Sequence, residues 1–171
     1  GESVPAEFRF SAKVPKHITH ELRLQMAEAS LEKFLAEVTG LGPKLGCLLI
    51  QLPPSLKFEA SVVNTFLTML RQLSNVPVAC EPRHATWFCT EADELLRRLE
   101  VTRVAADPAC VPAAAELGGW NSWSYYRLHG SPRTYYSAYD DVRLDDLATR
   151  LRRASAEITW CIFDNTALGA A

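Results

Sequence analysis

Several short motifs that assign a function by themselves are missing from this chain. It has no G-x-G-x-x-G, no Walker phosphate loop and no H-E-x-x-H, so the common dinucleotide, nucleotide and zinc-protease signatures are excluded. A formal net charge of −2 provides no general attraction for nucleic acid or for an anionic membrane. The sequence therefore gives no strong sign of a nucleic-acid partner.

Long hydrophobic runs and cysteine pairs are missing as well. No apolar stretch reaches the roughly 18 residues that cross a membrane, and residues 1–5 lack the basic flank and apolar core of a signal peptide. The five cysteines are odd in number, include no C-x-x-C pair and lie partly in apolar runs. We therefore expect an intracellular, cytoplasmic protein with reduced thiols, no membrane segment and no structural zinc.

A regular alternation of β-type and helical patterns does occupy the chain, whose 171 residues suffice for one domain. Short apolar or alternating runs predict strands at 7–14, 45–52, 78–81, 101–106, 124–130 and 158–163. Apolar residues at helical spacing predict helices at about 25–38, at 60–73, from an N-cap at Thr90, and at 144–154. Residues 16–20 and 131–141 are expected to be loops, and 113–117 either loop or one or two turns of helix.

Strands that alternate with helices require parallel pairing through right-handed crossovers. The fold class predicted from the pattern is therefore α/β. Two arrangements satisfy it, a doubly wound sheet and a parallel (β/α) barrel.

Polar residues stand at the carboxyl end of every predicted strand. Because parallel strands bring these ends to one face, we expect a site there for a small polar or anionic molecule. Ordinary solvated loops are the alternative. The strand-end residues are Lys13, Gln51, Glu81, Arg83, Asp107, Arg127, His129 and Asn165.

Glu81 and Asp107 are the predicted acidic pair, on neighbouring strands. They suit general acid–base catalysis or a divalent metal ion as cofactor. Alternatively, Glu81 forms a structural ion pair with Arg83 or Arg127. His129 precedes Gly130 and suits a proton shuttle or a metal ligand, or a histidine hydrogen-bonded to the backbone.

Basic and aromatic residues complete the candidate set. Arg83 and Arg127 suit the clamping of an anion, and Lys13 suits a nucleophile or base, anion binding or an ion pair. Gln51 and Asn165 are expected to contact substrate because they end their strands. Three further residues are expected at a pocket mouth or lid, with plain packing as the alternative: His84, Trp87 and Tyr135.

An ordered set of segments resembles the YecE-like family, domain of unknown function 72 (DUF72). The segments are 10–15 with 18–20, 45–46 leading to 51–54, 81–84 with Trp87, 126–130 and 163–166. The resemblance implies a TIM barrel classed with sugar-isomerase-like barrels. It also makes His20 a candidate site residue.

The chain departs from that family at its start and at single positions. The family begins with two further β-α units, so the resemblance implies a single shortened domain over 1–171 with six of eight strands and an incomplete or open barrel. Exposed strand edges would then allow homo-oligomers. Asp164-Asn165 stands where the family commonly has two asparagines, and Pro82 where a bulky apolar residue is usual.

Three functions follow as hypotheses. The first is a sugar-isomerase-like or hydrolase-like enzyme acting on a small polar or anionic substrate at the carboxyl face of the strands. The second is a barrel that acts on a nucleotide or nucleic acid. The third is a non-catalytic, truncated remnant.

Overall fold

Parallel strands, arranged in chain order, form the centre of the structure. The computed structural model describes residues 4–153 and 156–171. A five-stranded sheet has the order β1-β2-β3-β4-β6, and a three-stranded sheet has the order β5-β7-β8. The strands are β1 Phe10–Lys13, β2 Leu45–Gln51, β3 Val78–Glu81, β4 Val101–Arg103, β5 Ala105–Asp107, β6 Gly118–Gly119, β7 Trp123–Leu128 and β8 Ile158–Phe163. All pairs are parallel except β4 with β6, so the predicted α/β class is confirmed.

The two sheets meet at Val104, where the predicted strand 101–106 is broken. The Val104 N–H donates to the carbonyl of Cys80 on β3 at 2.9 Å, and the chain then leaves β4 and pairs with β7 as β5. Six predicted strands therefore become eight strand segments among the described residues: one strand is split and β6 is added. β6 needs glycine, because Gly119 has φ +64° and a Cβ there would lie 2.6 Å from the Val101 carbonyl.

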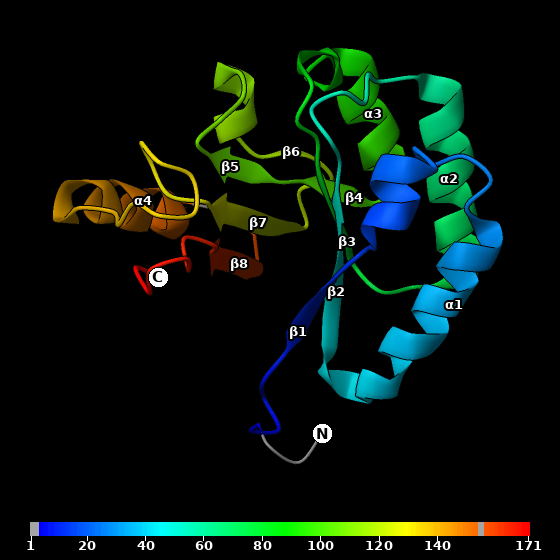
Figure 1. Ribbon diagram of the computed structural model, residues 1–171, viewed down its shortest axis with the longest axis horizontal. Helices are drawn as coiled ribbons and strands as arrows, with labels where there is room; N and C mark the ends of the chain where they lie inside the picture. The colour runs from blue at the N-terminus through cyan, green and yellow to red at the C-terminus, as the bar shows by residue number, and fades with distance from the viewer. Residues whose placement is uncertain (1–3, 154–155) are drawn as a thin grey trace.

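The helices lie in two groups on the outside of the strands. Figure 1 shows α1 Glu28–Val38, α2 Ala60–Leu73 and α3 Thr90–Arg98 together beside the five-stranded sheet, and α4 Asp141–Arg153 apart, near β7. Short helical turns occur at η1 His17–Glu21, η2 Thr39–Lys44, η3 Ala85–Trp87 and η4 Pro112–Ala115. No helix in the described ranges has the length and apolarity needed to cross a bilayer.

The helix at 60–73 and the strand at 158–163 are confirmed to the residue. Other boundaries differ. Helix α1 starts at Glu28 rather than Gln25, because Leu24 and Met26 have φ values of 68° and 47°, which an α-helix does not allow. Met26 is 97% exposed and so contributes nothing to the predicted apolar face.

Three smaller corrections concern the turns and caps. The predicted loop at 16–20 contains the π-helical turn η1. Thr90 is the first residue of α3, and its N-cap is Cys89. The predicted end of the fourth helix, at Ala154, lies outside the described residues, as do the first three residues of the chain.

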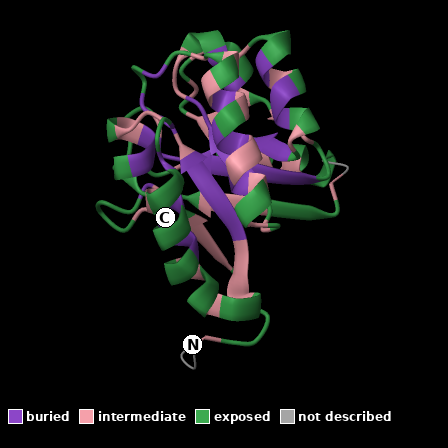
Figure 2. Ribbon diagram, turned by 90° about the vertical axis from the view of Figure 1, so that its right-hand side faces the viewer, coloured by how far each residue is buried: buried purple, intermediate pink, exposed green. Residues whose placement is uncertain are grey.

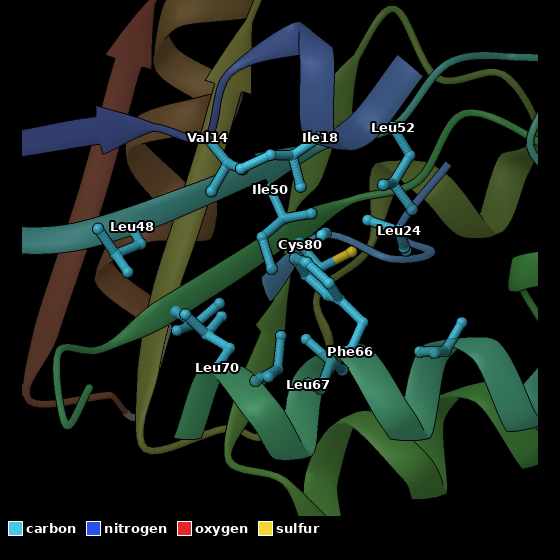
Figure 3. Packing of buried hydrophobic residues seen from close by; sticks show 14 of the residues in the cluster. Val14, Ile18, Leu24, Leu48, Ile50, Leu52, Phe66, Leu67, Leu70 and Cys80 are labelled. Carbon is cyan, nitrogen blue, oxygen red and sulfur yellow. The ribbon is translucent and has the colours of Figure 1, made fainter. Parts of the chain in front are cut away.

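Two apolar cores lie on opposite faces of the strands. Alternate residues such as Leu48 and Ile50 of β2 pack toward the helices, whereas Cys47 and Leu49 pack on the other face. Figure 3 shows the first core, where Phe66, Leu67 and Leu70 of α2 meet Leu48, Ile50 and Cys80. In Figure 2 the central strands are largely buried, and exposed residues lie on the helices and in the loops. The second core contains Cys47, Leu49, Ala79, Val104, Trp123 and Tyr125.

Leu70→Ala should destabilise the fold by about 3 kcal/mol, because it removes a fully buried side chain from the core between α2 and the strands. Urea unfolding followed by circular dichroism measures the change. The matched control is Val142→Ala on α4, which truncates a 71% exposed side chain and should change stability by less than about 0.5 kcal/mol. Equal losses in the two variants would contradict the core assignment.

Candidate functional site

The strand face that carries the second core ends in polar residues at its carboxyl edge. Side chains alternate along a strand, so the residue two positions after an inward apolar residue also points inward. This alternation places Gln51 after Leu49 on β2 and Glu81 after Ala79 on β3, and these two end residues are register partners. It also places Arg127 after Tyr125 on β7. The apolar core thus continues directly into a polar layer.

Glu81 lies at the centre of this polar layer and is only 1% exposed. Its Oε2 accepts a hydrogen bond from Arg127 Nη1 at 2.6 Å. Its Oε1 lies 2.9 Å from Arg83 Nη2, 3.0 Å from Arg83 Nε and 3.1 Å from His129 Nε2. The alternative interpretation, a structural ion pair of Glu81 with Arg83 or Arg127, is therefore present in the structure, and both arginines take part.

The contacts of Glu81 fix its charge state. Burial by itself would raise the pKa of this carboxyl group, but the hydrogen bond from His129 and the charges of Arg127 and Arg83 outweigh burial. The pKa falls from an ordinary value of 4.5 to about 2. Glu81 is therefore a permanent anion near neutral pH and a poor proton acceptor.

Asp164 supplies the second carboxylate of the site. Its Oδ2 accepts from Arg127 Nη2 at 2.5 Å and lies 3.0 Å from His129 Nδ1. Arg127 also donates from Nη1 to Gln51 Oε1 at 2.9 Å. Arg127 therefore bridges the two carboxylates, and the His129 ring lies between them with one nitrogen facing each. The charged cluster, as we call it, comprises Gln51, Glu81, Arg83, Arg127, His129 and Asp164.

The charged cluster does not suit a divalent metal ion. Each carboxylate already accepts hydrogen bonds from a guanidinium group, and an ion between Glu81 and Asp164 would lie beside the positive charge of Arg127. No group of three or more histidine, cysteine or acidic side chains with metal-binding geometry occurs in the part of the chain that the structure describes. The arginines neutralise the two carboxylates without a metal.

A pocket of about 280 Å³ opens onto one side of the charged cluster. Glu81, Arg83 and His129 form its polar wall, and Thr134 contributes from the loop after β7. The side chain of Arg83 is 25% exposed, so part of its guanidinium faces solvent while it pairs with Glu81. The remaining lining is mostly small and apolar and consists of Pro54, Pro82, Ala106, Pro108, Ala109, Cys110 and Ala114.

Tyr135 of the long loop stands next to this pocket. Its ring meets the His129 ring edge-on, with centroids 5.8 Å apart, and its N–H donates to the His129 carbonyl. Burial alone would lower the pKa of Arg83, but the charge of Glu81 raises it, and Tyr135 contributes in the same direction. The structure therefore brings Tyr135 to the site that the sequence predicted.

Asp107 does not join the charged cluster, and its predicted pairing with Glu81 is wrong. Its side chain is 41% exposed, and its Oδ2 lies 3.8 Å from Nη1 of Arg143 on α4. The reason is strand alternation: Thr102 and Val104 face the second core, so Asp107 faces the helix side. Its carbonyl still accepts from the His129 N–H at 2.7 Å.

Asn165 is also placed differently from the prediction, which put it in contact with substrate. Ile162 of β8 packs against the second core, so Asp164 shares its face and Asn165 points away. The buried Asn165 side chain donates to the Ser137 carbonyl at 2.9 Å and holds the tyrosine-bearing loop. Asp164 is the member of the charged cluster that was not predicted from the sequence, and the inward apolar positions of β8 were the signal for it.

Trp87 and His84 have contacts outside the charged cluster. Trp87 is almost fully buried, its Nε1 donates to the Leu56 carbonyl at 2.9 Å, and it packs edge-on against Phe58, so the packing alternative holds for it. His84 caps η3, where its Nδ1 accepts from the Thr86 N–H at 3.2 Å. No contact joins either side chain to the charged cluster among the described residues.

Lys13 and His20 lie near the site without joining the charged cluster. Lys13 ends β1 and is exposed. His20 lies in η1, where its Nδ1 is 2.8 Å from Thr19 Oγ1. Burial lowers the pKa of His20, and so do the positive charges of Lys16, Arg83 and Lys13. Three cations therefore act on His20, and the charge of Glu21 opposes them.

The fold and the site together define an α/β protein with mainly parallel strands and a buried arginine–carboxylate–histidine cluster at their carboxyl ends. A family model described as "Protein of unknown function DUF72" matches residues 1–171. The chain therefore belongs to the DUF72 family. A search of curated proteins found no match.

Solved structures of DUF72 family proteins are similar to this chain. One from Thermotoga maritima is 26% identical with a TM-score of 0.78, and the match covers 98% of this chain and 71% of that one. One from Enterococcus faecalis is 23% identical with a TM-score of 0.80, covering 98% of this chain and 75% of that one. At 23% identity, the similarity to the Enterococcus faecalis structure shows a shared fold and nothing more.

We expect the free energy of unfolding to fall as pH drops from about 4.5 to about 2, because the folded-state pKa of Glu81 is depressed. The contribution of Glu81 is present above its unfolded pKa and disappears as the carboxylate is protonated in the folded protein. A shift of this size corresponds to about 3 kcal/mol. Urea unfolding at a series of pH values measures it.

Glu81→Gln is the matched variant for this titration. It should lose about 3 kcal/mol or more at neutral pH, because Arg83 and Arg127 are left without their shared carboxylate. Its stability should also depend less on pH than that of the wild type over the acidic range. A variant that keeps the full acid dependence would show that other carboxyl groups produce it.

Proposed function

We propose that the chain is an enzyme that binds a small anionic molecule in the pocket beside the charged cluster and moves a proton on it, as a sugar isomerase or a hydrolase does. One observation carries this proposal: a partly exposed guanidinium and a histidine held between two carboxylates line the same pocket. We also propose that the parallel strands form part of a TIM barrel, whose catalytic groups gather at the carboxyl ends of the strands.

Arg83 is suited to bind the substrate's anionic group. It is the more exposed of the two arginines on Glu81, with 25% of its side chain accessible against 6% for Arg127. Arg127 uses both of its Nη atoms on Gln51, Glu81 and Asp164, so it holds the charged cluster together. A guanidinium that faces a pocket can form paired hydrogen bonds with a carboxylate or phosphate.

His129 is suited to carry the proton. Glu81 stays ionised to low pH, whereas an imidazole nitrogen can both accept and donate a proton. The contact between Asp164 and Nδ1 fixes the orientation of the ring, and the negative charge of both carboxylates stabilises the ring when it is protonated. In the proposed step Nε2 exchanges its contact with Glu81 for the substrate, while Nδ1 keeps its contact with Asp164. His129 is thus the proposed proton carrier, and Glu81 and Asp164 are positioning residues.

The size of the pocket favours a small substrate. Its volume of about 280 Å³ is just below the usual range of about 300–1,000 Å³ for ligand pockets. A monosaccharide or a sugar acid suits this space better than a nucleotide does. We therefore prefer the sugar-isomerase or hydrolase proposal to the nucleotide alternative.

His129→Asn should slow the reaction by about 100-fold or more, the usual effect of losing a general acid–base group. Two readouts cover the reaction classes: exchange of a carbon-bound proton with solvent deuterium in aldoses, ketoses and sugar acids, and hydrolysis of p-nitrophenyl esters. The control is His17→Asn, since His17 is exposed and its side chain pairs with Glu21 on the surface. Urea unfolding of both variants checks that the fold is retained.

Two outcomes would overturn the proposed function. One is equal activity in the wild type and in folded His129→Asn. The other is a wild-type protein that neither exchanges nor hydrolyses any compound in the panel.

A further inference from the structure

Basic side chains lie at the end of β1 and on the segments that follow β1 and β3, and one of them, Arg83, also belongs to the charged cluster. We define the basic rim as Lys13, Lys16, His20 and Arg83. We propose that the basic rim binds a doubly charged, phosphate-type group of the substrate, while the rest of the substrate occupies the pocket beside His129. This inference rests on the proposed function and names the substrate class, a small phosphorylated molecule.

The fold brings the basic rim to one place. β1 and β3 flank β2 in the sheet, so the segments after them leave from the same face. Lys13 ends β1 and shares its strand face with Ser11, whose Oγ is 2.8 Å from Tyr125 Oη in the second core. Lys16 precedes η1 and His20 lies within it, and Arg83 follows β3 and lines the pocket. Arg83 is therefore shared by the basic rim and the pocket.

The positive charge of the basic rim is incompletely neutralised by the protein. Within residues 4–153 and 156–171, the side chains of Lys13 and Lys16 form no ion pair and no hydrogen bond. Glu21 is the acidic group that acts on His20, and it is paired with His17 at 2.7 Å. The pKa of His20 is lowered by burial first and then by Lys16, Arg83 and Lys13, against a weaker opposing effect of Glu21.

A dianion fits this arrangement better than a monoanion does. A phosphate monoester carries close to two negative charges at neutral pH and offers three acceptor oxygens. Lys13 and Lys16, which have no side-chain partner among residues 4–153 and 156–171, provide charge and donors for it together with the exposed part of Arg83. A single carboxylate would leave at least one lysine unpaired. Arg127 takes no part, because its Nη atoms are already used inside the charged cluster.

Sulfate is the probe for this inference because it remains a dianion across the pH range in which histidine titrates. In the full chain, isothermal titration calorimetry at constant ionic strength should show sulfate binding about tenfold or more tightly than acetate. Lys13→Gln combined with Lys16→Gln should weaken sulfate binding by about tenfold. The control is Lys33→Gln on α1, an exposed lysine outside the basic rim, which should bind sulfate like the wild type.

The pKa of the His20 ring gives an independent measurement. It should change on sulfate binding only if the basic rim binds the anion. Sulfate in the basic rim should raise the pKa of His20, followed by NMR of its ring proton, with His20→Gln assigning the signal. Linkage then requires sulfate to bind more tightly at acidic pH, where His20 is protonated. Affinity that is equal for sulfate and acetate, a double lysine variant no weaker than Lys33→Gln, or an unmoved His20 pKa would each overturn the inference.

Failure of this inference can be told apart from failure of the proposed function. If sulfate does not bind but His129-dependent exchange or hydrolysis is seen, the phosphate site is wrong and the enzyme proposal stands. If sulfate binds through the lysines while no chemistry depends on His129, the anion site is supported and the enzyme proposal is overturned.

Discussion

The ion pair between Glu81 and Arg127 is the interaction on which the rest of the site depends. Both side chains are buried, and the 2.6 Å contact joins a strand end of one sheet to a strand of the other. An isolated charge at this depth would be strongly unfavourable, so each group requires its partner. Gln51, Asp164 and His129 take their positions around this pair.

Strand alternation explains why a charged cluster can exist inside an otherwise apolar interior. The central strands β2 and β3 each send one set of side chains to the helices and the other to the second core. At the carboxyl ends the second set becomes polar, and the charges there neutralise one another instead of facing hydrocarbon. Arg83 and Asp164 are less buried than the other charges, with 25% and 33% of their side chains exposed, and Arg83 lines the pocket. We place the proposed binding function at this pocket.

Regular patterns in the sequence predicted the α/β class, the limits of α2 and β8, and six members of the site: Gln51, Glu81, Arg83, Arg127, His129 and Tyr135. Local sequence did not reveal the break at Val104, since a hydrogen bond to Cys80 on another strand determines it. Alternation counted from Phe163 led to the prediction that Asn165 faces the site. Trp160 and Ile162 are the residues of β8 that pack on the second core, so Asp164 faces the site instead. The left-handed turn at Leu24 and Met26 carries no glycine to mark it.

The most direct test of this account is the titration of the Glu81 side-chain carboxyl group, observed by carbon-13 NMR in the folded protein, with Glu81→Gln used to assign the signal. The buried contacts with Arg127, Arg83 and His129 predict a carboxylate that stays ionised down to about pH 2. A carboxyl group that titrates near its ordinary value of 4.5 would show that the charged cluster is not formed as described.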